Sequence, residues 1–144
     1  AVLIVGGLLG PSLGAASLLL YLAVGAAGAP VFTPSPILPP GLGRLLGPTG
    51  GYLLAYPLAA YAVGRVTGNP KGHGAQRWLR LTLGVLAGLV LIHLGGLAQL
   101  TLITGNAQQA ARFGTLPFLL GDLGKVLLAV LILRPSVSSL RARL

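Results

Sequence analysis

The chain has 144 residues, of which 54% are hydrophobic and only 8% are charged, and its formal net charge is +9. So few polar side chains could not cover a soluble globule, which indicates an integral membrane protein. The net charge does not indicate a nucleic-acid-binding protein, because the basic residues lie at the ends of apolar runs rather than on one soluble face. The sequence contains no cysteine, which excludes a disulfide framework, a thiolate nucleophile and a cysteine-based metal site.

The first apolar segment, residues 1–9, is too short to cross a hydrocarbon layer about 30 Å thick, which takes about 20 helical residues. We therefore expect it to be the end of a helix that begins earlier. The chain contains no methionine, so residue 1 is not expected to be the translation start. Gly10 and Pro11 predict a break in the helix, and a short spanning helix is predicted from Ser12 to about Gly28.

Residues 30–48 are rich in proline and glycine, which predicts irregular backbone. Such backbone near a membrane has to be hydrated or buried in protein. The segment is therefore either a surface connector or a loop that folds back over a cavity. The next helix is predicted from Thr49 to Gly64, with a bend at Pro57. At its start, adjacent glycines allow the backbone to lie directly against a ligand or another helix.

Residues 65–80 are predicted to form a polar loop, with Trp78 at the membrane interface. Residues 81–104 form the longest apolar span. It is predicted to end at Gly105 and Asn106, because both residue types tolerate the left-handed conformation at a helix C-terminus.

A short loop is predicted to continue to Gly114. The last helix is predicted to begin with Thr115 as its N-cap and to end at Arg134, before Pro135. A basic tail follows it.

The arginine and lysine residues predict the orientation. Four of them lie in residues 65–80 and three in residues 134–143, whereas the connections at 30–48 and 105–114 carry one each. The positive-inside rule places the first two segments in the cytoplasm. The sequence therefore predicts a single domain over residues 1–144, an all-α polytopic transmembrane helix bundle in a lipid bilayer.

The last apolar segment contains Asp122, the only acidic residue, with Lys125 three residues later on the same helical face. A charge in hydrocarbon costs at least about 2.5 to 3.5 kcal/mol on insertion scales, so such a pair is a functional-site hypothesis. A matching ligand would bring an acceptor or anionic group to Lys125 and N–H or O–H donors to Asp122. Tyr52, Phe113 and Phe118 would supply apolar walls.

Two blocks of sequence carry a resemblance to a known family. The first comprises Gly-Leu-Gly at 41–43, Leu-Leu-Gly-Pro-Thr-Gly-Gly-Tyr-Leu-Leu at 45–54 and Tyr-Pro-Leu-Ala-Ala at 56–60. The second comprises Leu-Pro-Phe at 116–118 and Gly-Asp-Leu-Gly-Lys at 121–125. In this combination the chain resembles the BioY family, the biotin-binding S components of energy-coupling-factor (ECF) vitamin transporters.

The resemblance implies a bundle of six helices, of which the first helix and the start of the second would lie before residue 1. It implies high-affinity biotin binding from the outside and multi-pass insertion in a prokaryotic cell membrane. The implied partners are biotin and an ECF module of two ABC ATPases and a transmembrane T component. The implied substrate-binding residues are Asp122, Lys125, Thr49, Gly50, Gly51 and Tyr52.

Within this resemblance, we expect Lys125 to meet the valerate carboxylate of biotin and Asp122 to accept a hydrogen bond from a ureido N–H. Gln99 lies near the outer end of its helix, and we include it among the candidate substrate-binding residues. His93 lies in mid-span, where an interhelical hydrogen bond is the simpler interpretation. Arg44 is either a solvated loop residue or a group that steers an anion toward the site.

Several other functions are not expected. Two histidines without a carboxylate cluster do not predict a metal site, and no cofactor is predicted. No nucleophile and base pair is visible, so an enzyme is not expected. The alternative function is a small channel or a structural membrane subunit, in which the Asp122–Lys125 pair only holds helices together.

Overall fold

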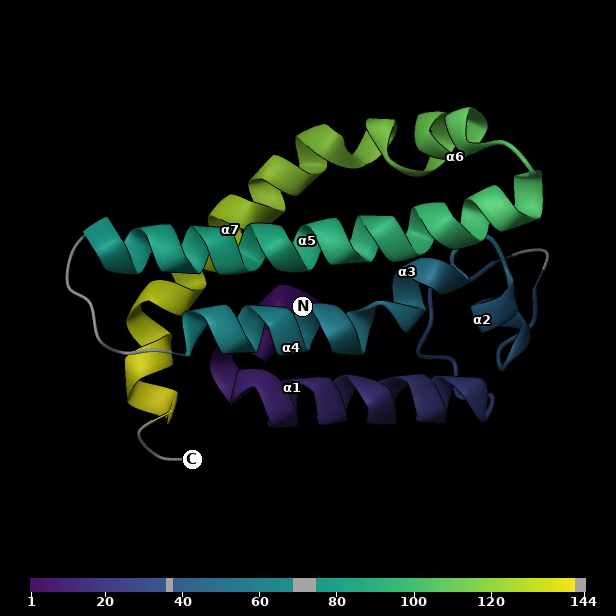
Figure 1. Ribbon diagram of the computed structural model, residues 1–144. Coiled ribbons are helices and arrows are strands. Elements are labelled where there is room, and N and C mark those ends of the chain that lie inside the picture. Colours follow the sequence, from purple (N-terminus) through teal and green to yellow (C-terminus); the bar gives the residue numbers. More distant parts are fainter. Residues whose placement is uncertain (36–37, 69–74, 142–144) are drawn as a thin grey trace.

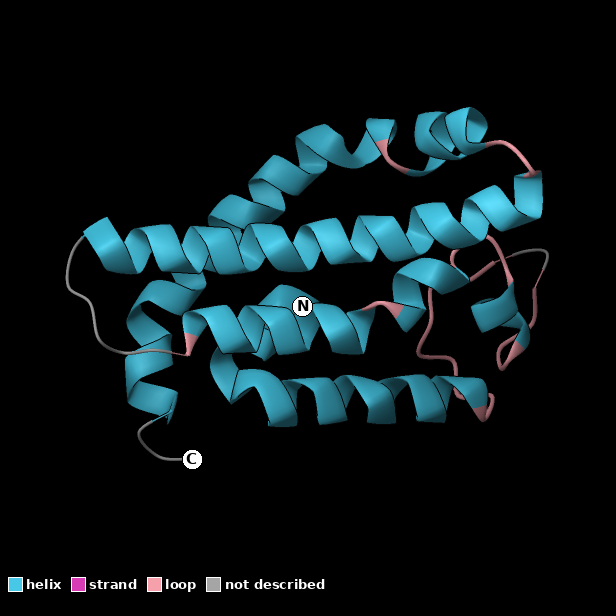
Figure 2. Ribbon diagram, viewed as in Figure 1, coloured by secondary structure: helices cyan, strands magenta, loops and turns pink. Residues whose placement is uncertain are grey.

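The computed structural model of the chain describes residues 1–35, 38–68 and 75–141. Within these ranges the chain forms helices and no strand (Figure 2), so the all-α prediction is confirmed. The elements are α1 (Val2–Ala26), α2 (Gly43–Leu46), α3 (Gly50–Leu54), α4 (Tyr56–Thr67), α5 (Ala75–Thr104), α6 (Ala107–Gly114), the 3₁₀-helix η1 (Leu116–Phe118) and α7 (Leu119–Arg141).

Helix α1 is bent at Gly10, as the Gly-Pro pair predicts. Gly10 has φ 85° and ψ −179°, a left-handed conformation that glycine adopts without a steric cost. Pro11 follows and has no N–H to donate to the preceding turn. Figure 1 shows α4 lying between α1 and α5. Close packing of α1 on α4 uses small residues, because a Cβ atom on Gly6 would overlap the backbone of Ala60.

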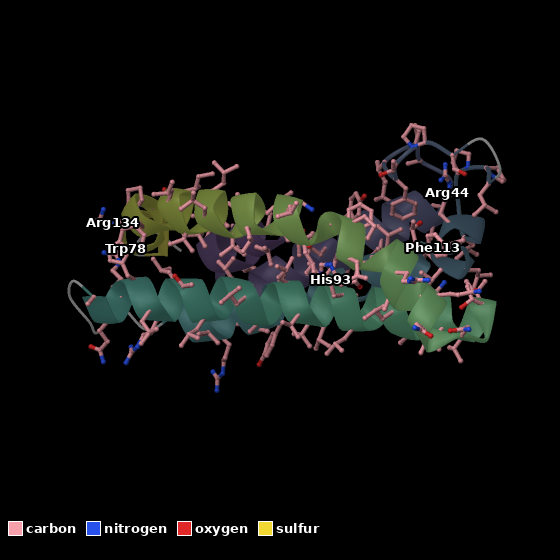
Figure 3. All side chains as sticks on the ribbon, turned by 90° about the horizontal axis from the view of Figure 1, so that it is seen from above. Arg44, Trp78, His93, Phe113 and Arg134 are labelled. Carbon is pink, nitrogen blue, oxygen red and sulfur yellow. The ribbon has the colours of Figure 1, made fainter. Side chains whose placement is uncertain are left out.

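The apolar core lies where α1, α4, α5 and α7 meet. Its buried members are Leu3, Val63, Leu81, Val85, Ala129, Val130 and Leu133. Near this core, the ends of α5 and α7 are joined by polar contacts. Arg77 Nη2 donates a hydrogen bond to the Arg134 carbonyl (2.6 Å), and the Arg134 guanidinium lies 4.6 Å from the centre of the Trp78 ring. Trp78 and Arg134 lie at the opposite end of the molecule from Arg44 (Figure 3).

Three helical segments are long and apolar enough to cross a membrane: Val2–Ala26, Ala75–Thr104 and Ala107–Ser136. Together with the composition, they make this a membrane protein. The single helix expected from Thr49 to Gly64 is instead divided into α3 and α4, which meet at Ala55. The break lies two residues before the expected bend, because Pro57 occupies the first turn of α4.

The polar loop expected at 65–80 is shorter than predicted, because α4 continues to Thr67 and α5 begins at Ala75. Thr67 keeps the helix intact by donating its hydroxyl to the Val63 carbonyl at 2.7 Å. Arg77 and Trp78 are ordered by their contacts with Arg134, which composition alone does not reveal. Residues 69–74 of this predicted loop lie outside the described residues.

Three further predictions were wrong: the loop at 105–114, the start of the last helix and its end. The loop expected at 105–114 contains α6, whose N-cap is Asn106: its Oδ1 accepts hydrogen bonds from the N–H groups of Gln108 (2.9 Å) and Gln109 (3.1 Å). The last helix begins after η1, and Thr115 makes no side-chain cap bond there. It also continues through Pro135 to Arg141, since a proline removes one helical hydrogen bond without always ending the helix.

Candidate functional site

Asp122, the acidic residue of the predicted site, contacts two basic side chains. Asp122 lies in the first turn of α7 and is only 3% exposed. Its Oδ1 accepts a hydrogen bond from Lys125 Nζ at 2.8 Å, and its Oδ2 lies 3.1 Å from Nε2 of His93 on α5. We call these three residues the Asp122 cluster. The predicted pair of charges is therefore formed, and His93 connects it to a second membrane helix.

One oxygen of Asp122 makes no hydrogen bond within the described residues. The His93 contact has the length of an ion pair but not the geometry of a hydrogen bond, so Oδ2 is buried without a hydrogen-bond partner among the described residues. Nδ1 of the same imidazole lies 3.1 Å from the Leu89 carbonyl. A buried carboxylate oxygen in this state is a site at which a ligand N–H would gain a strong hydrogen bond.

Tyr52 joins the cluster to the helices around it. Its hydroxyl donates a hydrogen bond to the Gly114 carbonyl at 2.6 Å, and its ring meets the His93 ring edge to face at 6.2 Å. The ring lies directly over Gly96, where a Cβ atom would overlap it. Tyr52 thus connects α3, α5 and the end of α6 beside the Asp122 cluster.

The two glycines before Tyr52 lie against α5 and α2. A Cβ atom on Gly51 would overlap the Gly95 carbonyl of α5, and one on Gly50 would overlap the Leu45 carbonyl of α2 and lie 2.7 Å from Gln99 Nε2 of α5. Both glycines are buried. The sequence allows adjacent glycines to lie against a ligand or against another helix. The structure shows the second use, and the close approach of the helices positions Tyr52. A direct contact of Gly50 or Gly51 with a substrate stays a prediction.

Gln99 holds the short helix α2 against α5. Its Nε2 donates to the carbonyls of Leu45 (2.9 Å) and Gly47 (2.7 Å), which satisfies two carbonyls at the end of α2. Thr49 is exposed at the N-cap of α3, without a side-chain cap bond. The structure therefore brings Asp122, Lys125 and Tyr52 together around His93, and places Gln99 and Thr49 farther along toward α2.

The expected apolar walls are more open than predicted. Phe113 and Phe118 have 74% and 52% of their surface exposed, and the Lys125 side chain is 61% exposed. A separate cavity of about 490 Å³ is lined by residues between 29 and 35, by residues 38–40 and by Arg44. Asp122 does not line this cavity. Of the two interpretations that the sequence left open for Arg44, the solvated loop residue is wrong, because Arg44 is only 8% exposed.

Comparisons with known proteins agree with the helical architecture. Residues 1–142 match the model of the BioY family. The chain is 38% identical over 131 residues to a Pyrococcus horikoshii protein named "Probable biotin transporter BioY", covering 91% of this chain and 72% of that protein. It is 30% identical over 134 residues to the "Biotin transporter BioY" of Lactococcus lactis, covering 92% of this chain and 69% of that protein.

A solved structure described as the S-component for biotin from an ECF-type ABC transporter superposes with a TM-score of 0.76 at 27% identity. The match covers 93% of this chain and 70% of the solved one. On the family match and these relatives together, the chain belongs to the BioY family.

Proposed function

We propose that this chain is a single transmembrane S-component domain that binds biotin with high affinity for uptake across the cell membrane. Membership of the BioY family and the biotin transporters among its relatives support the proposal. The structural observation that carries it is the buried Asp122 carboxylate with one uncommitted oxygen. The proposed partners are biotin and an ECF module made of two ABC ATPases and a transmembrane T component.

The Asp122 cluster suits the ureido ring of biotin, which combines N–H donors with a carbonyl acceptor. Oδ2 of Asp122 would accept from a ureido N–H. Lys125, whose ammonium carries three donors, keeps hydrogen atoms free beyond its bond to Oδ1 and would donate to an acceptor on the ligand. His93 holds the carboxylate from the opposite helix. These residues bind and orient the vitamin, and we propose no catalytic role for them.

The alternative is a structural membrane subunit in which the cluster only joins α5 to α7. One observation favours this alternative: Lys125 and His93 already contact the two oxygens of Asp122. An unsatisfied buried carboxylate oxygen destabilises a purely structural cluster, whereas a ligand N–H in a binding site would satisfy it.

Purification of the full chain in detergent followed by mass spectrometry of the co-purifying small molecule separates the two functions. The transporter subunit is expected to carry biotin through purification and, once emptied, to bind it saturably in isothermal titration calorimetry. A folded, emptied protein that shows no saturable heat with biotin would contradict the proposed function.

A further inference from the structure

Positive charge gathers at the end of the molecule where α4 ends, α5 begins and the last turns of α7 lie (Figure 1). Three helices contribute arginines there: Arg65 in the last turn of α4, Arg77 and Arg80 in the first two turns of α5, and Arg134 near the end of α7. The predicted orientation places this end of the molecule at the cytoplasmic face of the membrane.

Arg134 is held by two neighbours on α5. Its guanidinium lies 4.6 Å from the centre of the Trp78 ring, and its carbonyl accepts a hydrogen bond from Nη2 of Arg77 at 2.6 Å. A guanidinium over an aromatic ring is held through its face, so the N–H groups in its plane stay available to an anion. Arg134 is exposed. We call Arg77, Trp78 and Arg134 the arginine cluster.

No acidic side chain of this chain balances the charge of Arg134. Asp122 is the only acid in the sequence, and its two oxygens already contact Lys125 and His93. His93 lies sixteen residues after Arg77 on α5, which is about 24 Å along the helix axis. Asp122 is therefore too far from the arginine cluster for an ion pair, and the counter-charge has to come from outside the chain.

The surface beside Arg134 is apolar. Leu131 and Leu127 lie one and two turns before Arg134 on the same side of α7, and they are 47% and 60% exposed. Both belong to the membrane-length segment Ala107–Ser136, which ends two residues after Arg134. An anion that carries an alkyl chain matches this arrangement, because its charge would meet Arg134 while its chain covers the two leucines. A dissolved ion would leave the leucines uncovered.

We propose that the arginine cluster binds the phosphate headgroup of an anionic phospholipid of the cytoplasmic leaflet, with an acyl chain along Leu127 and Leu131. The fork of an arginine matches two oxygens of a phosphate, and a tryptophan suits the depth of the headgroups. Anionic lipids give the cytoplasmic leaflet a negative surface potential that attracts basic side chains. The bound lipid would fasten the ends of α5 and α7 to each other. The inference goes beyond the proposed function and does not depend on biotin.

Native mass spectrometry of the full chain in detergent, supplied with phosphatidylglycerol or with phosphatidylcholine of the same acyl chains, measures the affinity for each lipid. Wild-type protein is expected to bind phosphatidylglycerol at least about fivefold more tightly, the effect of one arginine beside an anionic surface. Arg134→Gln is expected to remove most of that preference by weakening phosphatidylglycerol alone. Arg112→Gln is the matched control. It removes an exposed charge from α6, which carries Phe113 at the opposite end of the molecule (Figure 3), and it should change neither affinity.

Arg134→Lys distinguishes a defined site from a general attraction between charges. Lysine keeps the positive charge, but it has neither the planar group that stacks on Trp78 nor the fork that matches two phosphate oxygens. Arg134→Lys is therefore expected to keep only part of the preference for phosphatidylglycerol. A preference equal to that of the wild-type protein would show attraction without a site and would overturn the inference.

Other results would also overturn it. Equal affinities of the wild-type protein for the two lipids would do so even if Arg134→Gln failed to fold, and would leave the arginines to an acidic protein surface. So would an Arg134→Gln variant that elutes as a folded protein in gel filtration and either keeps the full preference or loses affinity for both lipids equally. An equal loss in Arg112→Gln would assign the preference to the net charge of the protein instead of the arginine cluster.

Discussion

Nε2 of His93 lies 3.1 Å from Oδ2 of Asp122, and this contact joins the middle of α5 to the first turn of α7. An acid in the first turn of a helix is stabilised by the unpaired N–H groups and the positive end of the helix dipole. Lys125 balances the same carboxylate from the next turn. The acid is therefore stabilised in three ways, which makes a buried charge tolerable in an apolar segment.

Neutralising the acid is expected to weaken biotin binding. Asp122→Asn keeps the size of the side chain but removes the charge that a ureido N–H would meet, and Lys125→Ala removes the donor beside it. Each variant is expected to lower the affinity about tenfold or more, since a hydrogen bond to a charged group is worth about 1.5 to 3 kcal/mol. Calorimetry measures the affinity, and gel filtration confirms that the variants fold. Unchanged affinity in both variants would favour a purely structural pair.

Two substitutions of His93 distinguish its polar contact with Asp122 from the packing of its side chain. Gln can place an N–H near the position of Nε2, whereas Leu cannot donate at all. His93→Leu is expected to lower the free energy of unfolding by about 1 to 3 kcal/mol, because it leaves the buried carboxylate oxygen without a polar neighbour from α5. His93→Gln is expected to lower the free energy of unfolding by a smaller amount. Thermal unfolding in detergent measures both variants, and equal losses would show that His93 contributes only packing.

Some features of this fold follow directly from single residues in the sequence. The break at Gly10 was predicted because Gly and Pro together disfavour a continuous helix, and φ at Gly10 is 85°. The pairing of Asp122 with Lys125 was predicted because residues three apart share a helical face. Both depend on local geometry, which a sequence pattern records.

Helix α6 was predicted as a loop because it is short and polar, although Asn106 provides a local N-cap. Other features depend on contacts between distant segments. The partner of His93 was not predicted, since nothing in the spacing of residues 93 and 122 shows that α5 and α7 bring them within 3.1 Å. The burial of Arg44 depends on its place beside residues 29–35 and 38–40, which line the same cavity. In each case the tertiary arrangement outweighs the local preference.

Adding a methyl group at Gly51 is expected to separate α3 from α5. The new Cβ atom would overlap the Gly95 carbonyl, and backbone cannot move aside as a flexible side chain can. Overpacking of this kind costs about 1 to 3 kcal/mol, and it should also weaken biotin binding by displacing Tyr52. Thermal unfolding and calorimetry measure the two effects.

The matched control for this prediction is Gly124→Ala, because nothing lies within 4 Å of a Cβ atom at Gly124. That change is expected to be neutral or to stabilise α7 by up to about 1 kcal/mol, since alanine favours a helix over glycine. Equal destabilisation by the two changes would contradict the close approach of α3 to α5.

Changing Gln99 to Glu tests the attachment of α2 to α5. The substitution keeps the shape of the side chain but replaces the donor that bonds the carbonyls of Leu45 and Gly47 with a carboxylate oxygen, which those carbonyls repel. Gln99→Glu is expected to lower the free energy of unfolding by at least about 1 to 3 kcal/mol. Because Gln99 also lies against Gly50 and Gly51, which precede Tyr52, the affinity for biotin should fall as well. Gln109→Glu adds the same charge in the exposed first turn of α6, where the helix dipole favours it, and it should change neither quantity. If Gln99→Glu were as stable as the wild-type protein while its affinity still fell, Gln99 would contact the substrate directly, as the sequence suggested, instead of acting through α2.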